Sequence, residues 1–362
     1  MRLLHTGTLE LTDFIAPLKP PYAILSHTWG EGEILFADVQ GGRSALLSCG
    51  KPALSKVINV ASVARDHGFE YVWIDTCCID KSSSAELSEA INSMFSWYRK
   101  SAVCYAYIAD CESDQPENLS AKNRWFTRGW TLQELIAPTR VEFYNRDWVR
   151  IGDRAALAGV LSGITRMDDL LFKWHPHECC LIRKGLSTES GISKSTAYLP
   201  TCSFCRQNAV GMLESFSVAT RMSWAANRTT TREEDLAYSL LGIFGVTMPL
   251  LYGEGRNAFL RLQQEIARKT TDQSIFAFRV FKTDEFVHSA SDPLGTWLFA
   301  RSPSWFTDEM YPLTNKTFDP GTPLSLSSAG VELNLHIVPA ESHDQTLWIG
   351  ILNCSSVNDP FV

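Results

Sequence analysis

Three short apolar runs near the start of the chain each lead into polar residues that can hold a ligand. The runs begin at residues 22, 71 and 102, and polar side chains follow all three. Serine, histidine, aspartate and glycine are also common turn residues. Three successive runs that share the feature favour a ligand site at the carboxyl ends of strands. The candidate binding residues are Ser26, His27, Trp29, Gly30, Asp75, Cys77, Asp80 and, further along the chain, Trp130.

A single carboxylate, Glu134, is the candidate catalytic residue. It lies four residues after Trp130, and a helix places two such residues on one face. An indole that covers a carboxyl group raises its pKa, which suits acid–base or electrostatic catalysis. The alternative places Trp130 in the core and Glu134 on the surface, and the spacing alone favours that alternative.

The thiols and imidazoles allow two further kinds of chemistry. His27 with Cys77 or Cys78 could form a nucleophilic pair, although buried cysteines are more often core residues. A Cys-x-x-Cys pair later in the chain has zinc-knuckle spacing, but a loop that happens to contain thiols explains it better. The weak metal candidates are His175, His177, Cys179, Cys180, Cys202 and Cys205. The sequence contains none of the standard nucleotide, serine-hydrolase or zinc-protease motifs.

Alternating strands and helices must position these side chains. The sequence predicts strands at 22–26, 71–75, 102–108 and 141–144, and helices at 53–67, 84–100 and 128–136. This alternation predicts an α/β fold with a parallel sheet flanked by helices. The buried stripe of the first helix consists of Leu54, Val57, Ile58, Ala61 and Ala64.

The rest of the chain has a different character. We expect an α/β domain over residues 1–150 and a mainly helical region over 151–272, with a loop-like insertion at about 175–214. A small antiparallel β region over 273–362 begins with a strand at 275–278. The chain stops just after a predicted strand, as a truncated sequence would.

Composition excludes several classes of protein. The chain has 362 residues, of which 45% are hydrophobic and 20% charged, so it is long enough for a full core. A net charge of −7 disfavours nucleic-acid binding. The start of the chain has no secretory pattern, and the uncharged run at 236–253 contains glycines and a proline. We therefore expect a cytoplasmic protein with reduced cysteines and no membrane span.

Three ordered segments resemble the heterokaryon-incompatibility (HET) domain of filamentous fungi. They are Tyr22-Ala23-Ile24-Leu25-Ser26-His27-Thr28-Trp29-Gly30, Tyr71-Val72-Trp73-Ile74-Asp75-Thr76-Cys77-Cys78-Ile79-Asp80-Lys81, and the stretch from Arg124 to Pro138 that includes Arg128-Gly129-Trp130-Thr131-Leu132-Gln133-Glu134. The resemblance covers about residues 20–150. It implies a role in fungal non-self recognition, in which fusion of incompatible hyphae triggers regulated cell death.

The HET domain is in turn similar to TIR domains, which have a flavodoxin-like parallel sheet. Many TIR domains cleave NAD at the nicotinamide–ribose bond with one glutamate on a short helix before a late strand. Glu134 has that setting, since it precedes Pro138 and the predicted strand at 141–144. The resemblance therefore implies an NAD glycohydrolase that needs no cofactor. It also implies that the protein forms a homo-oligomer on activation and recognises an unidentified partner protein.

Three interpretations remain open at this stage. In the first, the protein is a death-inducing NAD glycohydrolase whose catalytic residue is Glu134. In the second, the same surface belongs to a non-enzymatic module that recruits a death-executing partner. In the third, a cysteine and His27 act as a hydrolase. Loss of function in Glu134→Gln separates the first from the second, and Cys77→Ser or Cys78→Ser tests the third.

Overall fold

The computed structural model describes residues 1–15, 19–173, 213–278 and 298–306, together with six short strands between Leu313 and Ser356. The chain divides into two compact units, Met1–Met212 and Leu213–Val362. The predicted domain boundaries near 150 and 272 stay predictions. The predicted insertion lies almost wholly outside the described residues.

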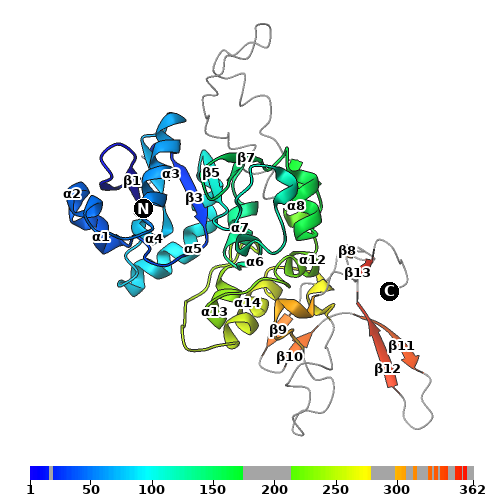
Figure 1. The fold of residues 1–362 in the computed structure, drawn as a ribbon. Helices are drawn as coiled ribbons and strands as arrows, with labels where there is room; N and C mark the ends of the chain where they lie inside the picture. Colours follow the sequence, from blue (N-terminus) through cyan, green and yellow to red (C-terminus); the bar gives the residue numbers. More distant parts are fainter. Residues whose placement is uncertain are drawn as a thin grey trace, which may run out of the picture. The chain divides into compact units, whose positions relative to one another are not determined.

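The first unit is built on one seven-stranded sheet (Figure 1). Its strand order is β2-β1-β4-β3-β5-β6-β7. The strands are β1 (Arg2–His5), β2 (Leu11–Asp13), β3 (Ala23–His27), β4 (Tyr71–Trp73), β5 (Val103–Tyr107), β6 (Val141–Tyr144) and β7 (Arg150–Asp153). The helices between and after them are α1 (Phe36–Gln40), α2 (Gly42–Leu47), α3 (Leu54–Asp66), α4 (Asp75–Cys78), α5 (Ser84–Lys100), α6 (Arg124–Thr127), α7 (Thr131–Ile136), α8 (Ala158–Thr165) and α9 (Leu170–Lys173), with a 3-10 turn at Pro116–Asn118.

The core of this sheet is parallel, and its edges are antiparallel. β4, β3, β5 and β6 pair in parallel, whereas β2, β1 and β7 pair antiparallel to their neighbours. The sequence predicts a wholly parallel sheet, which is wrong at the edges. β2 and β7 each follow a short reversal of the chain, and only antiparallel strands can be joined so briefly. When the four parallel strands are numbered in chain order, they lie across the sheet in the order 2-1-3-4. The direction in which the chain adds strands therefore reverses between β3 and β5.

The longest described helix of the unit, α5, shows why the predicted elements form. The Ser83 hydroxyl accepts a hydrogen bond from the Glu86 N–H, and Arg99 and Lys100 occupy the last turn, so both ends are stabilised. The buried side is a stripe of apolar and aromatic residues, and Tyr98 on it packs edge-on against Trp73 of β4. α3 differs from its prediction, because Ile58 is exposed and Lys56 is buried instead.

The second unit holds short helices and small antiparallel sheets. It contains α12 (Val218–Ser223), α13 (Glu233–Tyr238), α14 (Asn257–Ala267) and two 3-10 turns, at Gln273–Phe276 and Pro303–Trp305. Three two-stranded sheets pair β9 (Ser325–Ser327) with β10 (Gly330–Glu332), β11 (His336–Ala340) with β12 (Leu347–Ile351), and β8 (Leu313–Asn315) with β13 (Cys354–Ser356). The predicted antiparallel β region is therefore present.

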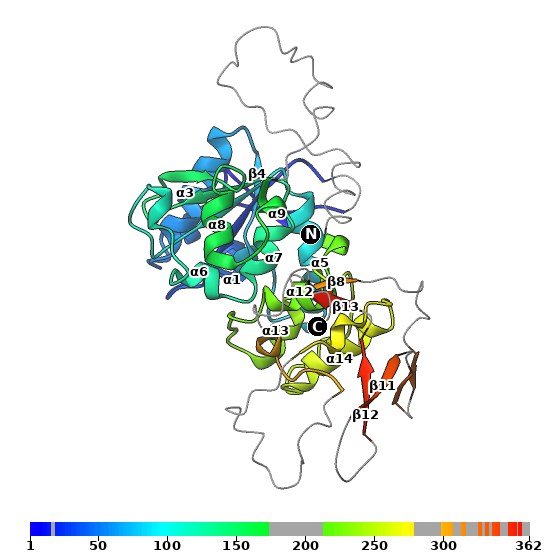
Figure 2. The same cartoon turned by 90° about the vertical axis from the view of Figure 1, so that its right-hand side faces the viewer.

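Two sequence predictions in the second unit have different outcomes. The strand predicted at 275–278 is wrong, because the Asp272 side chain accepts from the Ser274 N–H and starts a 3-10 turn there. The run at 236–253 forms only the end of α13 followed by turns, and no helix among the described residues is long and apolar enough to cross a membrane. In the first unit, α8 and α9 lie side by side and contact each other (Figure 2).

Candidate functional site

The end of β3 sends two neighbouring polar side chains to opposite faces of the sheet. Ser26 is fully buried and faces helices α6 and α7, while His27 faces α3. Successive residues of a strand alternate in this way. Because the strand order reverses between β3 and β5, this strand end also lies where α/β sheets commonly bind ligands.

On the first face, Glu134 ends a chain of three buried side chains. The Trp125 indole N–H donates to the Ser26 hydroxyl oxygen at 2.8 Å, and that hydroxyl donates to Glu134 Oε2 at 2.5 Å. Glu134 itself is only 6% exposed. The indole that reaches this carboxylate through Ser26 is Trp125, whereas Trp130 is half-buried and immediately precedes α7.

Two further groups are close enough to Glu134 to be affected by its charge. The Tyr98 hydroxyl donates to the Leu25 carbonyl, and burial, with a smaller contribution from Glu134, raises the pKa of Tyr98 well above its ordinary value. Burial also raises the pKa of the Cys104 thiol, and Glu134 adds to the effect. Both groups therefore stay neutral beside the buried Glu134.

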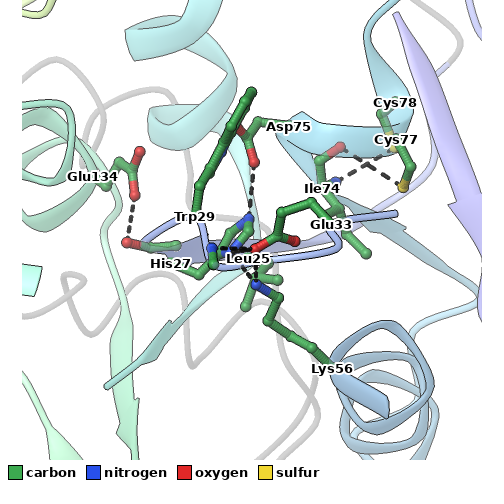
Figure 3. Close-up of polar contacts among 12 residues, drawn as sticks. Leu25, His27, Trp29, Glu33, Lys56, Ile74, Asp75, Cys77, Cys78 and Glu134 are labelled. Atoms are coloured by element: carbon green, nitrogen blue, oxygen red, sulfur yellow. Dashed lines mark hydrogen bonds and ion pairs between the residues drawn. The ribbon is translucent and has the colours of Figure 1, made fainter. Parts of the chain in front are cut away.

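On the second face, His27 and Trp29 both bind Asp75 (Figure 3). His27 Nε2 lies 2.9 Å from Asp75 Oδ1, and the Trp29 indole N–H donates to Oδ2 at 2.8 Å. Asp75 is the first residue of α4, two residues after the end of β4, so the ends of two neighbouring parallel strands meet here.

Lys56 and Glu33 are the remaining members of this cluster, and Lys56 determines which nitrogen of His27 carries the proton. The Lys56 ammonium donates to Glu33 Oε1 at 2.5 Å and to His27 Nδ1 at 2.8 Å. An ammonium group can only donate, so Nδ1 is the acceptor nitrogen of the imidazole. The proton of a neutral His27 is therefore on Nε2, from which it is donated to Asp75.

Charge holds Asp75 in its ionised form. Burial disfavours the carboxylate, but Lys81, His27 and the Trp29 N–H outweigh it and hold the pKa of Asp75 well below its usual range. The Lys81 ammonium lies 3.7 Å from Asp75 Oδ2 and 3.4 Å from the centre of the Trp29 ring. Burial lowers the pKa of Lys81, and Asp75 partly compensates.

A cleft of about 320 Å³ opens beside this cluster, between the loops that follow β3 and β5. It is within the size range of small-molecule sites. Its walls combine aromatic, acidic and basic side chains, including Trp29, Glu33, Lys56, Tyr107, Asp110 and Arg124. Arg124 is the residue before Trp125, so α6 contributes both to the cleft and to the buried chain that ends on Glu134.

The predicted site residues thus fall into separate groups. Trp29 and Gly30 line the cleft, and His27 and Asp75 support it from behind. Cys77 is buried in α4, where the neighbouring Cys78 and burial raise the pKa of its thiol. Asp80 accepts hydrogen bonds from Ser82 in the turn that follows α4. The six metal candidates lie outside the described residues, and no group of metal-ligand type occurs within the described ones.

Sequence reasoning missed Glu33, Lys56, Trp125 and Tyr98. Glu33 lies in the polar stretch after the first predicted strand, but its residue type did not distinguish it there. Lys56 gave no signal, because a lysine in an amphipathic helix is normally solvent-facing. A signal did exist for Trp125, which lies in the same tryptophan-rich stretch as Trp130. Choosing between the two indoles requires the path of the chain between α6 and α7.

The fold and site together define an α/β protein with a cleft at the point where the order of its parallel strands reverses. Residues 22–122 match the family model described as Heterokaryon incompatibility protein (HET), and residues 257–311 match a domain of unknown function, DUF8212. The chain is also 42% identical over 283 residues to Vegetative incompatibility protein HET-E-1 of Podospora anserina. It is therefore a HET domain protein and a homologue of that fungal protein.

These matches cover only parts of the chain and of the relative. The alignment covers 74% of this chain but only 18% of the Podospora protein, so the chain spans less than a fifth of that relative. The HET match contains Glu33, Lys56 and Asp75 and ends before Glu134. No solved structure matches the chain.

Proposed function

We propose that this protein acts in heterokaryon incompatibility, where its HET domain triggers regulated cell death after non-self recognition. The HET match and the homologue that is named as a vegetative incompatibility protein support this role. Most of the relative's length has no counterpart in this chain, so the partner that is recognised stays unidentified. Activation by self-assembly is part of the proposal.

We further propose that the toxic reaction is cleavage of NAD at the nicotinamide–ribose bond. The observation that carries this proposal is Glu134, a buried carboxylate held by Ser26 at the end of β3, in a sheet whose parallel strands have the order 2-1-3-4. That order is the one found in flavodoxin-like sheets. It supports the likeness to TIR domains.

The chemistry requires one carboxylate. NAD and water give nicotinamide, ADP-ribose and a proton. Positive charge develops on the ribose as the glycosidic bond breaks, and a carboxylate in a low-dielectric pocket stabilises it. Nicotinamide is a neutral leaving group, because the ring is cationic while bonded to ribose. No general acid and no cofactor are needed.

Burial of Glu134 fits a resting state. At 6% exposure, with Ser26 bonded to one carboxylate oxygen, Glu134 is almost wholly shielded from solvent. Displacement of α6 would break the Trp125–Ser26 bond and open a path from the cleft, since Arg124 of the same helix lines that cleft. Assembly of the domain is the proposed cause of this displacement.

The same burial favours a second candidate function. A carboxylate that is buried and bonded to Ser26 can serve to hold α7 on β3 without any chemistry. In that case the domain is a non-enzymatic module that recruits a death-executing partner. The two functions predict different outcomes for an isosteric change at Glu134.

The test follows free nicotinamide after NAD is added to the full chain, concentrated or crowded to favour assembly. Wild type, Glu134→Gln and Glu142→Gln are compared per folded molecule. Glu142 is a matched control, because it is also buried, lies on β6, pairs with Arg140 and is not part of the cleft lining. Release by wild type and Glu142→Gln but not by Glu134→Gln supports the enzyme. No release from folded, assembled wild type rejects it in favour of the recruiting module.

A further inference from the structure

Glu33 has one carboxylate oxygen that is satisfied and one that is not. Oε1 accepts from the Lys56 ammonium at 2.5 Å and from the Gly30 N–H at 2.7 Å. Oε2 is buried and has no hydrogen-bond partner among the residues that the structure describes. A buried oxygen of this kind costs free energy unless a donor reaches it.

Glu33 is a cleft residue that the protein itself holds in place. The side chain is only 6% exposed and lines the cleft between the loops that follow β3 and β5. Lys56 holds it from one side, and the glycine backbone holds it from another, so the carboxylate is fixed before any ligand arrives. A pre-positioned, water-poor acceptor suits recognition of an N–H group.

Other groups around the cleft suit a flat cationic ring. Trp29 and Tyr107 each supply one aromatic face, because Lys81 covers the other face of Trp29, which is 40% exposed, and Trp148 is stacked on the other face of Tyr107. Glu31 and Asp110 add two negative charges to the walls and Arg124 adds one positive charge, whereas the Lys56 charge is matched by Glu33, so the wall is negative in sum. Such a wall favours a cation with a donor group at its edge.

We propose that Glu33 Oε2 accepts a hydrogen bond from the carboxamide N–H of a bound nicotinamide ring, so that Glu33 selects the substrate. This inference rests on the proposed function, since it assigns the nicotinamide end of NAD to the cleft. Glu33 has no part in breaking the bond. Its role is to place the ring beside the path that leads through α6 to Glu134.

The experiment measures equilibrium binding to the full-length Glu134→Gln variant, which is expected not to consume the ligand. The probes are NAD and its 3-acetylpyridine analogue, in which a methyl group replaces the amide NH₂. Loss of one hydrogen bond to a charged acceptor predicts about tenfold to hundredfold weaker binding of the analogue. A third probe, the hypoxanthine analogue, lacks the adenine amino group and is expected to bind as NAD does.

A second variant checks the protein side of the same contact. Adding Glu33→Gln should weaken NAD by a similar factor and leave the acetylpyridine analogue nearly unchanged, so that NAD and the analogue become alike. Thermal unfolding verifies that this variant is folded. The ligand comparison needs no change at Glu33 and decides the question even where the variant unfolds.

The outcomes separate the two proposals. Equal binding of NAD and the acetylpyridine analogue overturns the role of Glu33 while nicotinamide release by wild type still supports the enzyme. Weak binding of the hypoxanthine analogue alone assigns the cleft to adenine and also overturns it. Absence of NAD binding together with absence of nicotinamide release rejects both proposals.

Discussion

Replacing Asp75 with asparagine tests whether one carboxylate holds the ends of β3 and β4 together. Asp75 accepts from His27 through one oxygen and from Trp29 through the other. In Asp75→Asn, an NH₂ group replaces one of these oxygens and faces a donor. The N–H of either His27 or Trp29 then has no acceptor, which lowers the unfolding free energy by about 1–3 kcal/mol at neutral pH.

The stability difference between wild type and Asp75→Asn should become smaller as the pH falls. Because the folded-state pKa of Asp75 is depressed, its stabilisation is fully present above the unfolded-state pKa of about 3.9 and is lost as pH falls through the folded-state value. A protonated Asp75 carries a donor, as asparagine does. The gap between wild type and variant should therefore be full at pH 6 and shrink below pH 4.

The assay is urea unfolding at several pH values, read by pulse hydrogen exchange at the amides of β3 and β4. This readout reports the first unit alone, so the second unit does not confuse the transition. Asp114→Asn, an exposed aspartate in the same unit, is the control and should change little at any pH. A gap as large at pH 3 as at pH 6 would refute the reasoning.

Three further stability changes follow from the same contacts and can be measured in the same assay. Ser26→Ala removes a buried hydroxyl that bonds to two partners, and we expect a loss of about 1–3 kcal/mol. Lys56→Met leaves Glu33 buried without its cation, which should cost about 3–5 kcal/mol, and an unchanged midpoint would exclude a working ion pair. Gly32→Ala should lower stability for two reasons, because φ is +64° and a Cβ would lie 2.6 Å from Pro52 Cδ. A variant as stable as wild type would contradict this backbone conformation at Gly32.

Local patterns predict the elements that carry their own signals. The helix at 84–100 has the predicted bounds, because its apolar stripe and polar ends agree. The parallel strands are likewise found from their β-branched and aromatic runs. β1, β2 and β7 are three or four residues long and escape such patterns. The 3-10 turn at Gln273–Phe276 reads as a strand because its apolar residues alternate.

The candidate site divides in the same way. That His27 and Asp75 lie close together follows from neighbouring parallel strands, whose carboxyl ends share an edge. The partnership of Lys56 with Glu33 does not follow, because it depends on how α3 and a loop pack, 23 residues apart in the chain. A buried lysine inside an amphipathic pattern acquires meaning only when its tertiary partner is known.

Helix α6 connects the two halves of the proposed mechanism. Arg124 lines the cleft, and Trp125 is bonded to Ser26, so a movement that widens the cleft at this helix also loosens the cover over Glu134. The bonds at stake are few, each with a net value of about 0.5–1.5 kcal/mol. An assembly interface of standard size, about 1,600 Å² in total, supplies far more than this when it favours the displaced helix. A domain that is inert alone and toxic when clustered needs only this modest difference between its two states.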